Sequence, residues 1–470
     1  MRIARAEQIA RNIAQQVEQG HLVPGTRIGS VRMAAAEHGV SKNTMVEAYD
    51  RLVAMGYLEP KRGSGFYVMR PRPRSPVTRP AHVSEAIDLV SLLREQLNKR
   101  HAVRVGDGRP PAAWMEASEL GRHLRASRRL AGDRIEHGYG APQGYGPLRE
   151  AIAGRLIERS IHVTADHILL TFGANHALDL IVRHFIEPGD AVLVDSPGYY
   201  PLFGKLRLAR AQVIGVRRGP EGPDLDDLAA KAAQHRPKLF FTQTLAHNPT
   251  GTSMEPAALH RLLQQAGDLG LILVEDDPFA DLLPPITPRL ATLDQLDRVI
   301  HVGTFSKTLS ASLRTGYIAA SPDLIRSLTD VKMLTVVNSS GYVEQLVHTL
   351  MAEGHYRHHL NRLRERVARA AAQTAANLAG IGFTGFSQPA GGYYLWCPLP
   401  EGIDDVELAR HASGNDIFLA PSSIFSLDRE GHVPALRINV AYGDDPRFLA
   451  FMSSLRAGAL PDLTAASVRG

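Results

Sequence analysis

The chain has 470 residues, of which 44% are hydrophobic and 21% charged, and its single cysteine, Cys397, has no partner within the chain. This composition is typical of a soluble globular protein with more than one domain, and it excludes an intrachain disulfide framework. No stretch approaches the roughly 18 consecutive apolar residues of a membrane span, so we expect a cytoplasmic protein without a membrane partner.

The positive charge is concentrated near the N-terminus. Residues 1–80 contain 13 Lys or Arg and 6 Asp or Glu, hence +7, whereas the whole chain carries +5 and the remaining 390 residues therefore carry −2. Such asymmetry is typical of a module that binds a polyanion such as DNA, although a charged, solvated surface is the simpler alternative.

Three short helices are predicted in this basic segment. Apolar residues at every fourth position predict an amphipathic helix over 5–19. Ser30 is a good N-cap for a second helix that ends near Glu37, and Ser41 is a good N-cap for a third. The side chains expected to face inward from the third helix are Met45, Tyr49 and Leu52.

A β-hairpin with a basic tip is predicted next, because strand-like segments at 56–59 and 66–69 flank residues 60–65. Three helices followed by such a hairpin, with the motifs from Pro24-Gly25-Thr26-Arg27 to Gly63-Ser64-Gly65, resemble the winged helix-turn-helix of the GntR family. In such modules a helix N-terminus enters the major groove, while the hairpin lies against phosphate or in the minor groove. The resemblance assigns these residues to contact with double-stranded DNA: Arg32, Ser41, Lys42, Asn43, Thr44, Lys61, Arg62, Gly63 and Gly65.

The composition changes again after the hairpin. Residues 70–80 contain four prolines and four arginines without apolar periodicity, which predicts an extended linker. We therefore predict a DNA-binding domain over 1–69, a linker over 70–85 and a second domain over 86–460. In that domain, helical stretches alternate with short apolar runs, as in a buried parallel sheet. The strands are predicted at 168–172, 191–194, 239–242, 271–274 and 299–302.

Lys307 is the first candidate for chemistry. It comes shortly after a predicted strand, beside the hydroxyls of Thr304 and Ser306, and Arg314 follows seven residues later. A lysine in this setting suits a Schiff-base amine beside a phosphate pocket, whereas an isolated lysine is more commonly a solvated surface residue.

Further motifs occur in the order shown by fold-type I enzymes that use pyridoxal 5′-phosphate (PLP), the aspartate aminotransferase superfamily, which this domain resembles. Gly173, Ala174 and Asn175 open a helix whose free N–H groups can hold a phosphate. The resemblance favours Tyr199 over Tyr200 as the ring that stacks on the cofactor, while core packing remains open for both.

Polar residues follow two more predicted strands. Asn248, within Asn-Pro-Thr-Gly, matches the family asparagine that binds the phenolic oxygen of PLP. Asp276 or Asp277 follows strand 271–274, where a carboxylate would keep the pyridine nitrogen protonated; spacing and resemblance favour Asp276. Phe279 stands where many family members have a tyrosine that donates to the cofactor, which puts efficient transamination in doubt.

The C-terminal part supplies a further candidate. Arg437 lies within an apolar run, and the resemblance assigns it to the α-carboxylate of a ligand. Tyr139 resembles the tyrosine that reaches the phosphate in a neighbouring subunit, which implies a homodimer. With the GntR-like head, these motifs resemble the MocR group of regulators. The implied fold class is α/β, with a winged helix-turn-helix, a fold-type I aminotransferase-like domain with a central mixed, mostly parallel sheet, and a smaller C-terminal α+β subdomain.

The resemblance implies a DNA-binding transcription regulator in which Lys307 holds PLP and an amino acid or amine effector displaces it by forming an external aldimine. PLP itself could also be the signal. A functional aminotransferase with an accessory DNA-binding domain is the alternative, because every cofactor contact except the Phe279 position is present. A mere dimerisation scaffold is disfavoured, since it would not need this set of residues. No metal site is predicted.

Overall fold

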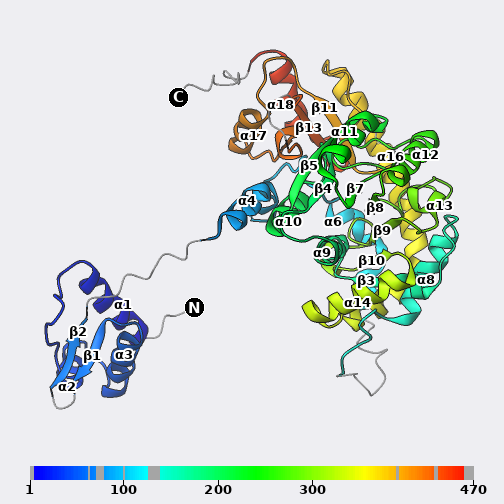
Figure 1. The fold of residues 1–470 in the computed structure, drawn as a ribbon. Coiled ribbons are helices and arrows are strands. Elements are labelled where there is room, and N and C mark those ends of the chain that lie inside the picture. The colour runs from blue at the N-terminus through cyan, green and yellow to red at the C-terminus, as the bar shows by residue number, and fades with distance from the viewer. Residues whose placement is uncertain are drawn as a thin grey trace. The chain divides into compact units, whose positions relative to one another are not determined.

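The computed structural model describes residues 5–61, 64–69, 79–98, 101–124, 138–387, 391–427 and 432–459. The chain forms two compact units, Met1–Arg79 and Pro80–Gly470 (Figure 1). Arg62, Gly63 and most of the predicted linker lie outside the described residues. Within the described part of the chain, no helix combines the length and the apolar character needed to cross a membrane.

The N-terminal unit contains the three predicted helices and the hairpin. The Oγ atoms of Ser30 and Ser41 accept hydrogen bonds from the backbone N–H groups of Met33 at 3.3 Å and Thr44 at 3.1 Å, and so cap the second and third helices. Its core includes the three predicted inward-facing side chains, all of which are buried. The elements are α1 (Arg5–Glu18), α2 (Val31–Glu37), α3 (Lys42–Ala54), β1 (Leu58–Lys61) and β2 (Gly65–Val68).

The first hairpin strand begins later than the predicted residue 56. Gly56, at φ 78°, and Tyr57 donate their N–H groups to carbonyls of α3 and so close that helix. The strand then continues through Pro60, which pairs with Phe66. The predicted hairpin tip is correspondingly shorter.

The second unit is built on an eight-stranded sheet in the order β3-β10-β9-β8-β7-β4-β5-β6. The pairs β4–β5, β4–β7, β7–β8 and β8–β9 are parallel, and β10 is antiparallel to both of its neighbours. The sheet is therefore mixed and mostly parallel, as predicted. Its strands are β3 (Ile168–Thr171), β4 (Ala191–Ser196), β5 (Gln212–Gly219), β6 (Gly222–Pro223), β7 (Leu239–Thr242), β8 (Ile272–Asp277), β9 (Val299–Thr304) and β10 (Gly316–Ala319).

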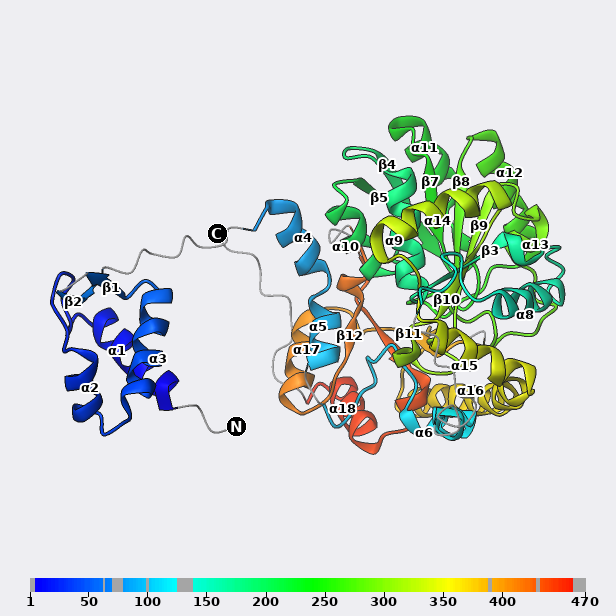
Figure 2. The same ribbon diagram turned by 90° about the horizontal axis from the view of Figure 1, so that it is seen from below.

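Helices cover both faces of this sheet (Figure 2). Neighbouring residues of one strand, such as Leu193 and Val194, are buried in two different hydrophobic clusters, one on each face. Burial on both faces explains why these strands read as continuous apolar runs. The helices are α8 (Gly146–Ile157), α9 (Ala174–Phe185), α10 (Tyr200–Leu208), α11 (Leu225–His235), α12 (Pro256–Asp268), α13 (Leu290–Asp294), α14 (Pro322–Val336), α15 (Gly341–Ala352) and α16 (His355–Gly380).

A smaller α+β subdomain completes the unit. Its antiparallel sheet has the order β11-β13-β12 and is accompanied by two helices. The elements are β11 (Tyr394–Pro398), α17 (Asp405–Gly414), β12 (Ala420–Pro421), β13 (Ala435–Asn439) and α18 (Pro446–Arg456).

The predicted linker ends earlier than residue 85. Helix α4 (Ala81–Leu89) begins directly after Pro80, and Ala86 is buried. The backbone of α4 runs close to Gly204 of α10, where an added Cβ would meet the Ala86 carbonyl oxygen at 3.0 Å. Helix α4 thus packs closely against α10, and residues 81–85 form its first turn and a half rather than part of an extended linker. They are followed by α5 (Ser91–Asn98), α6 (Ala112–Met115) and a 3-10 turn, η1 (Glu116–Ser118).

Residues 103–109, which we call the strap, lie between α5 and α6 in the sequence and run along the C-terminal subdomain. Val103 and Gly106 exchange backbone hydrogen bonds with Phe418 at 2.8 and 2.7 Å. The backbone N–H of Asn439 in β13 donates to the Val105 carbonyl at 2.8 Å. The strap is thus attached to the subdomain by main-chain bonds.

Candidate cofactor and ligand site

A cavity of about 150 Å³ lies at the carboxyl ends of β8 and β9 and beside the N-terminus of α9. Loops that follow parallel strands meet at one edge of a sheet, which is where α/β proteins place their ligands. The structure brings most of the predicted cofactor residues to this cavity. Those lining it are Ala174, Asn175, Tyr199, Asn248, Asp276, Thr304, Ser306, Lys307 and Arg314.

The amine of Lys307, which lines the cavity, is hydrogen-bonded to the strap. Its Nζ donates a hydrogen bond to the carbonyl of Gly108 and lies 3.5 Å from the hydroxyl of Tyr394. The Tyr394 hydroxyl donates to the same carbonyl at 3.0 Å. The hydroxyl of the adjacent Tyr393 donates to the Lys307 carbonyl at 2.7 Å, which fixes the backbone at the lysine.

Asp276 presents an incompletely bonded carboxylate to the cavity. Its Oδ2 accepts a hydrogen bond from Nε2 of Gln243 at 2.6 Å, whereas its buried Oδ1 has no hydrogen-bond partner. Burial raises the pKa of Asp276 to about 6. The neighbouring Asp277 is instead bound by Arg289, with Nε–Oδ2 at 2.6 Å, and does not line the cavity. Of the two candidates, Asp276 is therefore the carboxylate that can meet a ligand.

The opposite end of the cavity has the character of an anion site. Gly173, at φ 77°, is the N-cap of α9, and a Cβ there would approach Nη2 of Arg314 to 3.1 Å. Arg314 donates to the Phe172 carbonyl at 2.9 Å and lies 3.4 Å from Oγ of Ser306. A helix N-terminus, an arginine and hydroxyl groups together favour a phosphate.

Arg437 is 3% exposed and lies behind Asn248. Its Nη1 donates to Oδ1 of Asn248 at 2.9 Å, and its Nη2 donates to the Gly106 carbonyl of the strap at 2.7 Å. The guanidinium is stacked between the rings of Tyr394 and Phe425, at 4.5 and 4.9 Å. Its buried Nε has no hydrogen-bond partner. The arginine is thus held in place by stacking while a donor remains unused.

The aromatic residues take different positions. Tyr199 lines the cavity, and burial raises its pKa well above the ordinary value, so the phenol stays neutral. Tyr200 packs against Phe425 at 5.5 Å and is not among the lining residues. Phe279 lines the cavity and makes edge contacts with the rings of Tyr393 and Tyr394, each at 5.5 Å. Geometry therefore favours Tyr199 for stacking.

Two polar residues of the cavity, Gln243 and Tyr394, escaped the sequence analysis. Gln243 follows β7 directly and bonds both Asp276 and the backbone N–H of Asn248, the latter at 2.8 Å. Its place after a buried strand was the signal that could have revealed it. Tyr394 gave no such signal, because its partners on the strap are far away in sequence.

Tyr139 does not reach the cavity of its own chain. Its side chain is 84% exposed and it is absent from the cavity lining. A role for Tyr139 at the site therefore needs a second subunit.

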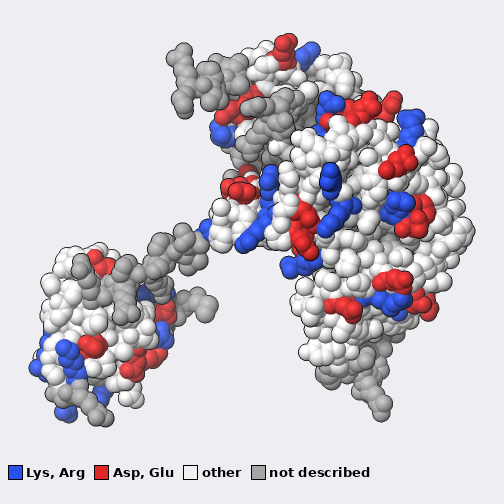
Figure 3. Space-filling view, in the orientation of Figure 1, with Lys and Arg blue, Asp and Glu red and all other residues white. Residues whose placement is uncertain are grey.

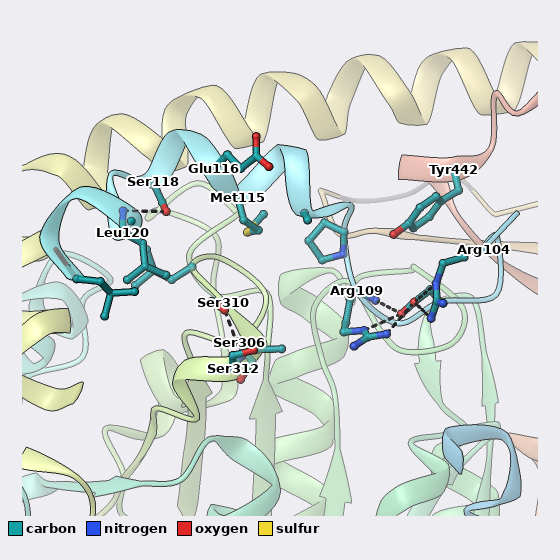
Figure 4. Close-up of a pocket in the computed structure, with 17 residues that line it drawn as sticks. Arg104, Arg109, Met115, Glu116, Ser118, Leu120, Ser306, Ser310, Ser312 and Tyr442 are labelled. Carbon is teal, nitrogen blue, oxygen red and sulfur yellow. Dashed lines mark hydrogen bonds and ion pairs between the residues drawn. The ribbon is translucent and has the colours of Figure 1, made fainter. Parts of the chain in front are cut away.

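A larger pocket of about 550 Å³ opens beside the cavity, and Ser306 and Ala311 line both (Figure 4). One wall comes from the Lys307 loop with Ser310 and Ser312, and the other from the segment of α6 and η1. Two arginines of this pocket, Arg104 and Arg109, are both ion-paired with the buried carboxylate of Asp107, at 2.7 and 3.1 Å. Burial alone would raise the pKa of Asp107, but the hydrogen bonds and charges of the two arginines outweigh it and lower the pKa.

In the N-terminal unit, the described DNA-contact candidates lie at the surface. Arg32, Ser41, Lys42 and Asn43 are exposed, and Thr44 is half-buried. The hydroxyls of Ser41 and Thr44 are 2.8 Å apart, so both also take part in the helix cap. Figure 3 shows basic side chains at the surface of this unit. The hairpin candidates described are Lys61, 4.7 Å above the Tyr67 ring, and Gly65, at φ 100°.

Two families match the chain in separate places. Residues 102–455 match aminotransferase class I and II, and residues 5–68 match the bacterial regulatory proteins of the gntR family. The chain belongs to the class I and II aminotransferase family, fused to a GntR-type helix-turn-helix.

Relatives of this aminotransferase-family chain include both regulators and enzymes. It is 28% identical to the probable rhizopine catabolism regulatory protein MocR of Rhizobium meliloti, over 98% of this chain and 97% of that protein. It is 32% identical to the 2-aminoadipate transaminase of Thermus thermophilus, over 64% of this chain and 79% of the enzyme. The crystal structure of the α-aminoadipate aminotransferase LysN from Thermus thermophilus, complexed with N-(5′-phosphopyridoxyl)-L-leucine, matches with a TM-score of 0.72 at 27% identity, over 80% of this chain and 97% of LysN.

Proposed function

We propose that this protein is a PLP-dependent, DNA-binding transcription regulator that senses an amino acid or amine at Lys307. The observation that carries the proposal is the placement of the Lys307 amine and the unsatisfied carboxylate of Asp276 in one cavity of a chain that also has a helix-turn-helix. The near full-length similarity to a regulatory protein favours the same arrangement, in which one unit binds DNA and the other binds the ligand.

The residues of the cavity fit PLP. The buried Oδ1 of Asp276 lacks a partner, which a protonated pyridine nitrogen would supply, and the N-terminus of α9 with Arg314 would hold the phosphate. Asn248 would bind the phenolic oxygen, and Tyr199 would stack on the ring. When bound, PLP supplies an aldehyde that reacts with the lysine amine and can exchange it for the amine of a ligand.

Arg437 and the neighbouring pocket define the ligand. The unused Nε of Arg437 and its fixed guanidinium favour a carboxylate, so we propose an amino acid over a simple amine. The ligand side chain would extend into the pocket of Figure 4, where Asp107 is ion-paired with both arginines and serine hydroxyls form one wall.

DNA binding is assigned to the N-terminal unit. The exposed first turn of α3, with Lys42 and Asn43, would enter the major groove, and Lys61 of the hairpin would lie near phosphate. A ligand regulates only if it binds one DNA-binding arrangement more tightly than another. Bound ligand should therefore change DNA affinity.

We further propose a homodimer in which the exposed Tyr139 completes the phosphate site of its partner. Subunit mixing tests this point. Tyr139→Phe and Lys307→Ala homodimers should both bind PLP poorly, whereas a mixed dimer contains one complete site and should recover about half of the wild-type PLP. No recovery would refute the shared site.

A functional aminotransferase remains the second candidate, favoured by the similarity to a transaminase. Against turnover, Phe279 offers no hydrogen-bond donor to the cavity. The two candidates are separated by adding a 2-oxo acid to the protein with an amino acid ligand: sustained conversion of the oxo acid would make the protein an enzyme.

The central experiment titrates PLP-loaded, full-length protein with amino acids, amines and pyridoxal vitamers, while visible absorbance and operator-DNA binding are recorded together. We expect an absorbance change that stops without turnover and a parallel change in DNA affinity. Lys307→Ala should lose the lysine-bound PLP absorbance. Arg437→Met should lower the affinity for amino acids by at least about tenfold and leave the affinity for the corresponding amines unchanged. Wild-type protein that takes up no PLP would refute the proposal.

A further inference from the structure

Three metal-ligating side chains from distant parts of the sequence meet outside the cavity. They are His123, Glu353 and His355, and one ligand atom of each lies within 4.8 Å of the others. Glu353 is the C-cap of α15, and His355 is the first residue of α16. Gly354 between them has φ 77°, a left-handed conformation that a glycine adopts without strain, and it brings both side chains to the same side.

The distances suit a tetrahedral metal ion. The Oε2 atom of Glu353 lies 3.4 Å from Nε2 of His123 and 3.2 Å from Nε2 of His355. Metal–nitrogen and metal–oxygen bonds of 2.0–2.2 Å at tetrahedral angles separate neighbouring ligand atoms by about 3.3 Å. Glu353 thus already lies at ligand-to-ligand spacing from both histidines, while the two histidine nitrogens lie within 4.8 Å of each other.

His123 gives an independent indication. Its side chain is 9% exposed, and its buried Nε2 has no hydrogen-bond partner although it faces Glu353. The ring lies 5.0 Å from that of His355, which also directs Nε2 toward the same carboxylate. A buried imidazole nitrogen without a partner is costly, and a metal ion at this point would satisfy it.

The donor set indicates the class of ion. Two imidazole nitrogens and one carboxylate oxygen suit Zn²⁺ and other first-row transition metals, whereas Mg²⁺ and Ca²⁺ prefer oxygen ligands alone. Glu353 is 49% and His355 30% exposed, so the fourth position faces solvent and can hold water.

We propose that His123, Glu353 and His355 form a binding site for a zinc-class dication. Bound metal would fasten the helical turn that contains His123, and with it a wall of the pocket beside Lys307, to the junction of α15 and α16. The residue after His355, Tyr356, has its hydroxyl 2.7 Å from that of Thr308, next to Lys307. This proposal does not depend on PLP or on DNA binding.

The test uses untagged, full-length, PLP-loaded protein freed of excess PLP, which would itself chelate metal. Equilibrium dialysis against buffered ZnCl₂ followed by elemental analysis should give one zinc per chain that is lost in the variants. His123→Ala and His355→Ala should each lower the zinc affinity at least about tenfold, because losing even a residue that only hydrogen-bonds to a metal ligand lowers metal affinity by that much. His358→Ala, an exposed histidine of α16 outside the cluster, is the matched control and should bind as wild type.

Folding of the variants is checked by far-ultraviolet circular dichroism, which does not require bound PLP. Free zinc should raise the melting temperature of the wild type and not that of His123→Ala. If the variants do not fold, Co²⁺ added to the wild type gives the answer, because a tetrahedral site absorbs visible light far more strongly than an octahedral one. Equal zinc affinity in wild type and His123→Ala, no zinc bound by the wild type, or a weak octahedral Co²⁺ spectrum would each overturn the proposal.

Discussion

Replacing Asp276 by asparagine should stabilise the PLP-free protein at neutral and alkaline pH. Burial raises the pKa of Asp276 from its ordinary 3.8 to about 6, so the folded state binds a proton more tightly than the unfolded state. The contribution to stability is therefore fully present below pH 4 and is lost as the pH rises through 6. A pKa difference of about two units corresponds to a loss of about 3 kcal/mol in the free energy of unfolding at pH 8 and of about half of that at pH 5.

Asparagine cannot ionise and should avoid this loss. Urea unfolding followed by tryptophan fluorescence measures the effect, because both tryptophans, Trp114 and Trp396, belong to the C-terminal unit. The free energy of unfolding of PLP-free Asp276→Asn should exceed that of PLP-free wild type by up to about 3 kcal/mol at pH 8 and by much less at pH 4. Asp330→Asn, at an exposed position, is the control and should show no such pH dependence.

Added PLP should make the wild type more stable than Asp276→Asn, because the wild-type carboxylate gains a charged partner and the amide does not. The reasoning fails if PLP-free Asp276→Asn is no more stable than wild type at pH 8, or if the difference does not shrink toward pH 4.

Three smaller predictions concern other parts of the chain. Ser41→Ala removes the acceptor for the Thr44 N–H and should cost about 1 kcal/mol, seen as about fivefold faster hydrogen exchange along α3; unchanged exchange would contradict the cap. Arg289→Met leaves the Asp277 carboxylate buried without its ion pair and should lower the free energy of unfolding by about 3–5 kcal/mol, whereas a loss below about 1 kcal/mol would mean that the pair is not needed. Lys61→Ala should weaken binding to all DNA sequences and reduce the salt slope of affinity by about 1; an unaltered slope would remove Lys61 from phosphate contact.

The sequence predicts the central sheet well where the signal is local. Strands β3, β4, β7, β8 and β9 are buried on both faces and appear as apolar runs between turns. Strands β5, β6 and β10 were not predicted; β10 (Gly316–Ala319) begins with a glycine directly after the Arg314 motif, and exposed polar residues interrupt the apolar run of β5. The first five residues of α4 were assigned to the linker, because apolar periodicity indicates a helix only from Ala86 onward.

The site was predictable to the extent that its residues follow strands or open a helix. Lys307 and Asn248 follow strands, Asp276 lies near the end of β8, and the cavity contains all three. Tyr394 and the strap depend on contacts between segments hundreds of residues apart, for which spacing in the sequence carries no signal. The cluster of His123 with Glu353 and His355 escaped prediction for the same reason.

The strap links the ligand site to the rest of the chain by a short covalent route. Its carbonyls meet both Lys307 and Arg437, while its backbone is bonded to the C-terminal subdomain. Any rotation of that subdomain must therefore pull on residues 103–109. Helices α5 and α4 come before the strap in the sequence, and the close approach of α4 to Gly204 of α10 fastens that segment to the same unit, so the strap holds the ligand site and the C-terminal subdomain together within one compact body.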